Sequence, residues 1–180
     1  QRLALIERHR YVGYGGARGG GKSWFVRWKA VLLCLNYPGI KILITRKTYR
    51  ELLNNHITPL SAILDGVAVY NRTDKCFLFP NGSSIWFGYC ACDADLDQYQ
   101  GAEYDVIGFE EATHFKEEWM QFITTSLRTT KQNFKPRIYY TCNPGGPSHG
   151  YFRRLFIDQQ YEDGEDPKDY AFIQALVTDN

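Results

Sequence analysis

The sequence predicts an α/β fold with a mostly parallel sheet, flanking helices and an antiparallel hairpin added at one edge. Segments with the period of a strand and of a helix alternate over the first 65 residues. This alternation favours parallel strands joined by crossover helices. Farther along, an Asn-Gly pair separates two apolar runs, which is a strong signal for a hairpin.

The composition is typical of one globular domain. The chain has 180 residues, of which 44% are apolar and 16% are aromatic. No apolar run approaches the roughly 20 residues that cross a bilayer, and the charged first residues do not fit a signal peptide. Because the chain starts at Gln1 without Met and ends at Asn180 on a strand exit, we expect residues 1–180 to be a single domain from a larger protein.

Charge and cysteine usage add two expectations. The net charge is only +1, but residues 1–50 hold eleven Lys and Arg against one acid. Such a basic segment can meet the phosphates of a nucleotide or of DNA, although an ordinary mixed surface remains an alternative. The five cysteines are odd in number and fit no common zinc pattern, so we expect free thiols in a reducing compartment.

Residues 16–23 fit the G-x-x-x-x-G-K-[ST] pattern of a phosphate-binding loop. Glycines let the backbone N–H groups turn toward a polyphosphate, and the positive end of the next helix favours the anion. Lys22 can reach the β- and γ-phosphates, Arg18 can contact the γ-phosphate, and the Ser23 hydroxyl can bind Mg²⁺. The predicted nucleotide-binding residues are Gly16, Ala17, Arg18, Gly19, Gly20, Gly21, Lys22 and Ser23.

The segments around this loop favour a functional site over a chance match in a glycine-rich turn. Residues 11–14 predict a short strand before the loop, and a helix is expected to follow it and to end near 37–39, Tyr-Pro-Gly. The apolar residues that recur at helical spacing in this helix are Phe25, Trp28, Leu32 and Leu35.

The next segments continue the alternation. Residues 40–45 form a β-branched apolar run, typical of a buried parallel strand. Thr48 and Glu51 fit a capping box, after which a helix is expected to run to Leu64 with a bend or interruption at Pro59. A strand over 67–70 follows, and then a hairpin that joins strands 76–79 and 84–87 through Pro-Asn-Gly-Ser. Asp93, Asp95 and Asp97 lack the spacing of a calcium loop and indicate a solvated acidic loop.

Residues 104–109 predict a buried strand that runs directly into Glu110 and Glu111. Acids at the carboxyl end of such a strand lie in the crevice beside the phosphate loop. In many P-loop ATPases the first acid supports Mg²⁺ and the second polarises the attacking water. We assign these roles to Glu110, together with Ser23, and to Glu111, while two acids at an ordinary strand end are the alternative. The two motifs together predict a P-loop NTPase of the RecA-like (ASCE) type.

The last part of the chain predicts a helix over 115–129, a strand over 137–142, a short helix around 151–156 and a final strand over 170–177. Thr141 and Asn143 lie where the strand over 137–142 leaves the sheet. Their side chains are expected to sense the γ-phosphate by hydrogen bonding. The alternative is a turn that the Asn side chain stabilises.

Three motifs in this order resemble the ATPase domain of the large terminase subunit of tailed bacteriophages. They are the phosphate loop that contains Arg18, the Glu-Glu-Ala-Thr run at 110–113 and Thr-Cys-Asn-Pro at 141–144. The resemblance covers nearly all of the chain. It implies a Mg²⁺-dependent ATPase that moves double-stranded DNA into an empty procapsid in the host cell cytoplasm. The partners it implies are double-stranded DNA, the portal protein, the small terminase subunit and further copies of the chain in a ring, with a monomer expected for the isolated domain.

The resemblance also implies roles for single residues. Glu111, Lys22 and Arg18 would be catalytic, and Thr141 and Asn143 would couple hydrolysis to movement. The segment 46–48, Arg-Lys-Thr, resembles one that helicase-like ATPases place near phosphates or DNA.

Two positions depart from the family pattern, and one domain of the family has no counterpart in the sequence. The family commonly has Asp where this chain has Glu110, which is one methylene longer and keeps the charge. Where some members have an arginine that acts on a neighbour's ATP, this chain has Gln100, so such an arginine either comes from elsewhere, with Arg128 as one candidate, or is absent. No segment here fits the nuclease domain of large terminases, so we expect no DNA cleavage.

Two other functions stay open at this point. One is a helicase-like or other DNA-translocating ATPase, which strand-separation activity would reveal. The other is an ATP-binding module that needs activation by a partner, which the dependence of its rate on protein concentration would reveal. A nucleotide kinase is disfavoured because no basic lid segment is present in the sequence.

Overall fold

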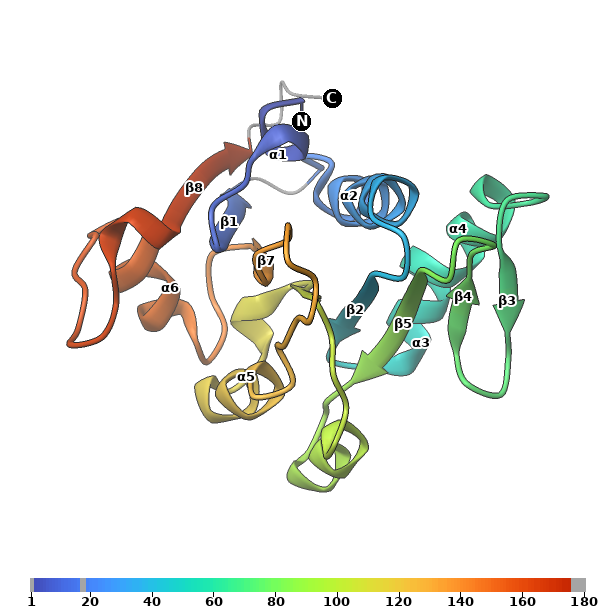
Figure 1. Ribbon diagram of the computed structural model, residues 1–180. Coiled ribbons are helices and arrows are strands. Elements are labelled where there is room, and N and C mark those ends of the chain that lie inside the picture. Colours follow the sequence, from blue (N-terminus) through green and yellow to red (C-terminus); the bar gives the residue numbers. More distant parts are fainter. Residues whose placement is uncertain (1, 17–18, 176–180) are drawn as a thin grey trace.

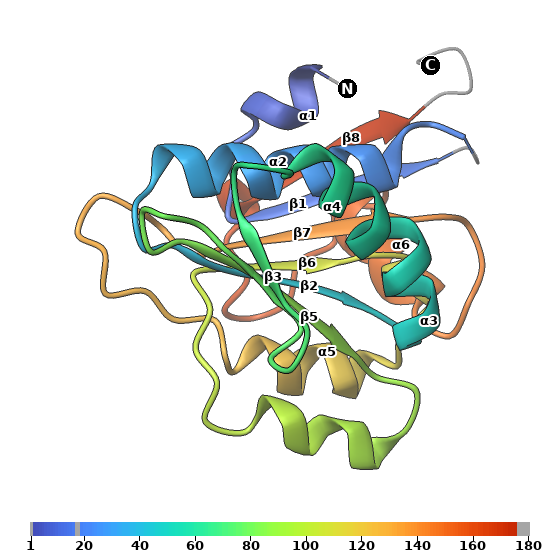
Figure 2. The ribbon, with the colours of Figure 1, turned by 90° about the vertical axis from the view of Figure 1, so that its right-hand side faces the viewer.

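The computed structural model describes residues 2–16 and 19–175, which build an eight-stranded sheet with helices on both faces (Figures 1 and 2). The strand order is β3-β4-β5-β2-β6-β7-β1-β8. The strands are β1 (Tyr11–Gly16), β2 (Lys41–Arg46), β3 (Val69–Asn71), β4 (Cys76–Leu78), β5 (Ser84–Tyr89), β6 (Val106–Phe109), β7 (Arg137–Cys142) and β8 (Tyr170–Ala175).

The pairing within the sheet confirms the predicted fold class. The six strands from β5 to β8 along this order are parallel, whereas β4 pairs antiparallel with β5, and β3 pairs antiparallel with β4. The turn at 79–83 joins β4 to β5, where Phe79 N–H donates to Ser83 O at 2.9 Å, as the Asn-Gly signal predicts. The hairpin is therefore an antiparallel addition to a parallel sheet.

The helices bury two apolar clusters, one on each face of the sheet. The first face carries α1 (Arg2–Ile6), α2 (Lys22–Asn36), α3 (Tyr49–Leu52), the π-helical turn η1 (Leu53–Ile57) and α4 (Thr58–Ile63). The second carries the 3₁₀ segment η2 (Asp93–Tyr99), α5 (Glu117–Thr124) and α6 (His149–Phe156). Two further 3₁₀ turns are η3 (Ala112–His114) and η4 (Pro167–Asp169). No described helix is long and apolar enough to cross a membrane.

Helix α2 turns a different face to the sheet than the sequence pattern indicates. Leu32 and Leu35 are 37% and 53% exposed, while Phe25 is buried as expected. Because apolar residues surround most of this helix, their spacing alone does not single out the buried side. Lys29 belongs to that side, and its ammonium group donates to the carbonyl oxygens of Leu5 and Glu7 at 2.5 and 2.8 Å.

Two other helices differ from expectation in extent. The helix after β2 is interrupted by η1, before Pro59 rather than at it, and this wider turn brings His56 into the interior. The predicted helix over 115–129 is limited to α5, because the chain beyond it becomes extended. Tyr104 N–H donates to Ser126 O at 2.9 Å, and Arg128 N–H donates to Tyr104 O at 2.9 Å. The last strand is described to Ala175, and residues 176–177 of the predicted strand lie outside the described residues.

Candidate active site

A cleft of about 930 Å³ lies at the carboxyl ends of β1, β2, β6 and β7. These four strands are neighbours in the sheet, so the residues that follow them meet at one edge. The lining side chains come from the phosphate loop and from three other strand ends, and they include Lys22, Arg46, Glu111 and Asn143. The motifs that the sequence places far apart therefore converge on one cavity.

The phosphate loop is anchored from beneath by β1. The buried Tyr14 hydroxyl donates to Gly20 O at 2.7 Å, and Gly21 N–H donates to Gly19 O at 2.8 Å. Gly19 and Gly21 have φ values of 83° and 70°, which L side chains rarely adopt, so glycine suits both positions. Ala17 and Arg18 lie outside the described residues, and the roles predicted for them stay predictions.

Lys22 is the first residue of α2, directly after the loop, and it shares the cleft with acidic groups. Burial lowers the pKa of Lys22, while the nearby Glu111, Cys142 and Glu110 act in the opposite direction. The predicted phosphate-binding lysine is thus brought close to both acids at the end of β6. Ser23 lines the same cleft one residue farther along.

Glu110 is buried at the floor of the site between two basic side chains. Its Oε2 contacts Arg46 Nη1 and the imidazole Nε2 of His56, and all three residues are buried. Burial alone would raise the pKa of Glu110, but His56, Arg46 and the Ser23 hydroxyl lower it to about 2. Glu110 is therefore an anion at neutral pH despite its burial.

The second carboxylate oxygen of Glu110 provides a test of whether a metal ion fits here. Oε1 is buried and has no hydrogen-bond partner among the described residues. A buried charged oxygen without a partner is costly, and a hard cation with oxygen ligands removes that cost. Since the Ser23 hydroxyl lies close enough to lower the pKa of Glu110, these two residues fit a Mg²⁺ ion.

Glu111 adopts a left-handed backbone conformation, with φ 51° and ψ 49°. Such a conformation costs about 1 kcal/mol or more in a non-glycine residue and is found where neighbouring contacts enforce it. Its N–H donates to Thr141 Oγ1 at 3.0 Å. Its carboxylate lies 2.9 Å from Arg46 Nη2 and 3.2 Å from His114 Nδ1. The carboxylate is thereby held over the cleft from both sides.

Arg46 connects the acids of the site through one guanidinium group. Besides Glu110 and Glu111, it reaches Glu51, whose Oε2 lies 3.5 Å from Arg46 Nε. Burial opposes the charge of Arg46, but the neighbouring carboxylates raise its pKa above the ordinary value. Arg46, the first residue of the segment 46–48 that resembles one placed near phosphates or DNA, thus lines the cleft. Thr48 instead caps α3, where its hydroxyl accepts from Glu51 N–H at 3.4 Å, which is one of the two bonds of the predicted capping box.

The loop after β7 packs on the segment after β6. Thr113 Oγ1 donates to Asn143 O at 3.1 Å, and Ser148 Oγ donates to Phe115 O at 2.5 Å. The Asn143 Oδ1 atom is buried and has no partner among the described residues. Asn143 lines the cleft with this oxygen buried, while Thr141 contacts the backbone of Glu111. Of the two predicted coupling residues, Asn143 lines the cleft, whereas Thr141 is fully buried behind Glu111 and does not line it.

The structure does not bring every highlighted residue into the cleft. Arg128 lies beside Tyr104 at the amino end of β6, and its guanidinium is 3.4 Å from Glu103 Oε1. That position is at the opposite end of strand β6 from Glu110. The segment with Asp93, Asp95 and Asp97 forms η2, where Asp95 accepts from Ala91 N–H at 2.7 Å. No group of three or more potential metal ligands occurs among the described residues.

Besides His114 and Glu51, which contact Glu111 and Arg46, sequence reasoning missed three further residues that belong to the site. His56 contacts Glu110 from η1, Arg27 lines the cleft and donates through Nη1 to Asn55 O, and Trp24 lines the cleft beside Ser23. Arg27 follows Ser23 by four residues on α2, so helical spacing is a signal that could have found it. No local pattern points to His56, because its partner is 54 residues away in the sequence.

Comparison with known proteins gives one family and several similar folds. A family model described as "Phage terminase large subunit" matches residues 8–180. The large terminase of a thermophilic bacteriophage superposes with a TM-score of 0.76 at 19% identity, covering 98% of this chain and 42% of that one. A structure of the same terminase in complex with ADP gives a TM-score of 0.74 at 20% identity, covering 96% and 41% of the two chains. No curated protein sequence gives a significant match.

Two isolated domains extend the structural similarity. The ATPase domain of the Thermus phage P74-26 large terminase has a TM-score of 0.68 at 15% identity, with 96% of this chain and 78% of that chain covered. The N-terminal domain of the DNA packaging ATPase from bacteriophage phi29 has a TM-score of 0.64 at 14% identity, with coverages of 95% and 92%. The chain therefore spans less than half of the first terminase and most of each of these two domains.

Proposed function

This chain belongs to the phage terminase large subunit family, and from that premise we propose that it is an ATPase domain that powers the packaging of double-stranded DNA into a procapsid. One observation carries the proposal. Two consecutive carboxylates lie beside a phosphate-binding loop: Glu110 is buried near Ser23, and Glu111 lines the cleft near Lys22.

The proposed reaction is the in-line attack of water on the γ-phosphate of ATP. The backbone of the loop and Lys22 hold the phosphates. Ser23 and Glu110 would hold Mg²⁺, which would supply positive charge to the phosphate oxygens. Glu111 orients the attacking water, because its carboxylate is fixed at the rim of the same cleft. Arg18 contacts the γ-phosphate, and Thr141 and Asn143 transmit its loss to the loop after β7.

The proposed partners follow from the family and from its known members. They are double-stranded DNA, the portal protein, the small terminase subunit and further copies of this chain in a ring, acting in the host cell cytoplasm. The similarity to a DNA packaging ATPase of phage phi29 supports DNA as the moving partner. The arginine that completes a neighbour's site is proposed to come from another segment than Gln100, with Arg128 still a candidate because it is exposed at the other edge of the sheet.

A direct test is Mg²⁺-dependent ATP hydrolysis across a series of protein concentrations. Lys22→Ala is expected to abolish turnover and to weaken ATP binding, and Glu111→Gln is expected to abolish turnover while ATP still binds. A rate per molecule that rises with concentration would support subunits that complete each other's sites. Full turnover by Glu111→Gln would refute the role of this carboxylate, and absence of both binding and turnover would refute the proposed function.

Two contacts favour a second candidate, an ATP-binding module that a partner activates. The carboxylate of Glu111 is engaged by Arg46 and His114 rather than pointing free into the cleft. If this arrangement persists with ATP bound, the isolated chain will bind ATP without turnover. ATP binding with a negligible rate at every protein concentration, followed by activation when DNA or portal protein is added, would establish this candidate.

A further inference from the structure

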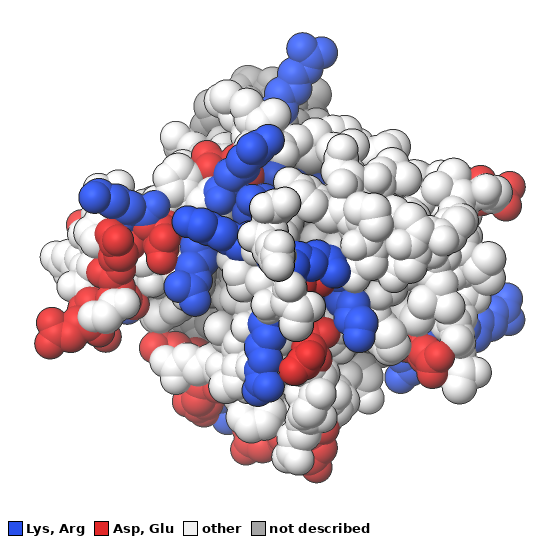
Figure 3. Space-filling model, viewed as in Figure 1, with Lys and Arg blue, Asp and Glu red and all other residues white. Residues whose placement is uncertain are grey.

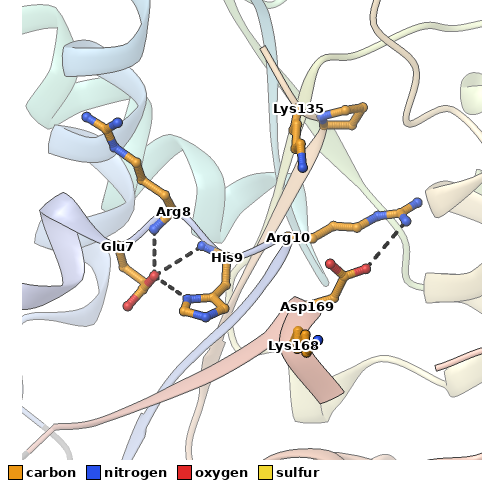
Figure 4. Close-up of a pocket in the computed structure, with 8 residues that line it drawn as sticks. Glu7, Arg8, His9, Arg10, Lys135, Lys168 and Asp169 are labelled. Carbon is orange, nitrogen blue, oxygen red and sulfur yellow. Dashed lines mark hydrogen bonds and ion pairs between the residues drawn. The ribbon is translucent and has the colours of Figure 1, made fainter. Parts of the chain in front are cut away.

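A basic pocket lies at the amino ends of the parallel strands, whereas the candidate active site lies at their carboxyl ends. Its volume is about 560 Å³, and Arg8, Arg10, Lys135 and Lys168 line it together with two acids, Glu7 and Asp169. Figure 4 shows these residues around the pocket on three separate segments of the chain, with the guanidinium groups of Arg8 and Arg10 pointing apart. Neither the proposed mechanism nor the family motifs of the sequence use any of them.

Parallel strand pairing explains why these cations meet. Tyr11 of β1 is in register with Ile138 of β7 and with Tyr170 of β8, so all three strands begin at this edge. Ile138 N–H donates to Arg10 O at 2.7 Å, and the rings of Tyr11 and Tyr170 stack at 4.8 Å. The residues just before the three strands are therefore held together by the framework of the sheet rather than by a loose loop.

The acids of the pocket leave much of its positive charge uncompensated. The Glu7 carboxylate accepts from Arg8 N–H at 2.6 Å and contacts His9 Nδ1 at 2.5 Å, so it serves the turn between α1 and β1. Asp169 pairs with Arg10 at 3.7 Å (Figure 4). The side chains of Arg8, Lys135 and Lys168 are exposed and have no ion pair among the described residues.

Further cations lie near the pocket. Buried Lys29 has its pKa lowered to about 8, first by burial and then by the nearby charges of Arg137 and Arg8. Figure 3 shows Lys and Arg side chains across the middle of this face with a few acidic side chains among them, while larger groups of acidic side chains lie to the left and at the bottom. A band of cations matches an extended polyanion better than a single small anion.

We propose that this pocket, at the amino ends of β1, β7 and β8, binds the phosphate backbone of double-stranded DNA. The proposal rests on the proposed function, because that function supplies duplex DNA as the partner. The proposed DNA contact lies at the amino ends of the strands and the nucleotide site at their carboxyl ends, so that strands of the sheet connect the two sites. Binding is expected to be independent of base sequence, because the contacts that the pocket offers are charges, which bind phosphates and read no base.

The test is the binding of a short labelled DNA duplex, followed by fluorescence anisotropy at salt concentrations between about 50 and about 200 mM. The variant carries Arg8→Ala and Lys135→Ala. A matched control carries Arg153→Ala and Lys116→Ala, which also removes one Arg and one Lys, at exposed positions paired with acids elsewhere on the surface. All four side chains are exposed, and an unchanged melting temperature verifies that both variants fold.

The first variant is expected to bind DNA about tenfold more weakly or worse, with the salt slope reduced by about 1.8, since each lost phosphate contact removes about 0.9. The control is expected to keep the wild-type affinity and slope. Equal losses in both variants, or no loss in the first, would overturn the proposal. Unchanged DNA binding with lost self-association would also overturn it, by showing that the pocket is an interface between copies of the chain.

The DNA pocket and the ATPase assignment fail in distinguishable ways. A wild-type protein that hydrolyses ATP but binds no duplex would overturn the DNA pocket and leave the ATPase assignment in place. A protein that binds duplex through Arg8 and Lys135 but neither binds nor hydrolyses ATP would overturn the proposed function and keep the pocket as a DNA site.

Discussion

The hydroxyl of Thr141 accepts a hydrogen bond from the backbone N–H of Glu111 at 3.0 Å. This bond joins the end of β7 to the residue that follows Glu110 after β6, and Glu111 there has a φ of 51°. A single side chain from one motif therefore helps to fix the backbone of another. Because the direction of the Glu111 carboxylate depends on that backbone, any movement of the loop after Thr141 is expected to alter catalysis.

Replacing Thr141 with Val removes the hydroxyl and keeps the shape of the side chain. The N–H of Glu111 then loses its acceptor, and we expect kcat to fall about 10- to 100-fold through misplacement of the carboxylate. ATP affinity is expected to change little, because Thr141 does not line the cleft. Thr141→Ser retains the hydroxyl and serves as the control. A Val variant with the turnover of the wild type would show that the bond has no catalytic role.

Gly146 and Gly145 offer a matched pair of substitutions in the same loop. Both have positive φ, 92° and 99°, so an alanine at either position carries a backbone cost of about 1–2 kcal/mol. A Cβ on Gly146 would lie 2.2 Å from Thr113 O, whereas a Cβ on Gly145 would meet nothing within 4 Å. We expect Gly146→Ala to lower both the free energy of unfolding and kcat more than Gly145→Ala does, as measured by denaturant titration and ATP hydrolysis. Equal effects would refute the close packing of this loop on Thr113.

The buried charge of Glu110 predicts how stability depends on pH in Mg²⁺-free buffer. Its pKa is about 2 in the folded protein and near 4.5 for an unperturbed carboxyl, so the folded state favours the anion. The resulting stabilisation, about 3 kcal/mol, is present above pH 4.5 and is lost as the pH falls toward 2. Urea unfolding between pH 4.5 and pH 2 is expected to show this loss of stability in the wild type and a smaller loss in Glu110→Gln. The exposed Glu118→Gln is the control for loss of one charge, and parallel curves for wild type and Glu110→Gln would contradict the assignment.

The parts of the site that the sequence predicts are those with a local pattern. Lys22, Glu110 and Asn143 each lie within a motif that follows a strand, and parallel pairing then brings strand ends to one edge. The same logic predicts β7 at its observed bounds, because Arg137–Cys142 is a buried run that ends at a sharp loop.

Features that depend on distant partners are not predictable in this way. The sequence does not show which side of α2 packs on the sheet, because apolar residues lie on several sides of this helix. Ser126 and Arg128 leave the helical pattern because Tyr104, which is remote in sequence, offers backbone hydrogen bonds. His56 reaches Glu110 from the widened turn η1, and neither that turn nor the pairing leaves a local signal in the sequence.

The histidine pairs of the chain provide a comparison between a buried and an exposed contact. His56 is fully buried and contacts the Oε2 of buried Glu110, whereas His9 and Glu7 are 2.5 Å apart with side chains 44% and 24% exposed. We expect His56→Ala to lower the free energy of unfolding by about 3 kcal/mol, since it leaves a buried carboxylate with Arg46 as its remaining basic partner. His9→Ala is expected to cost less than about 1 kcal/mol. Denaturant titration at neutral pH measures both.

A double variant separates the charge of Glu110 from the packing of the imidazole. If His56 stabilises the fold by compensating that charge, then adding Glu110→Gln to His56→Ala is expected to cost less than Glu110→Gln does in the wild type. If His56 acts only by filling space, the two losses add. Additive losses would therefore limit His56 to a packing role, whereas a positive coupling energy would identify it as a residue that holds Glu110 in the charged form near Ser23.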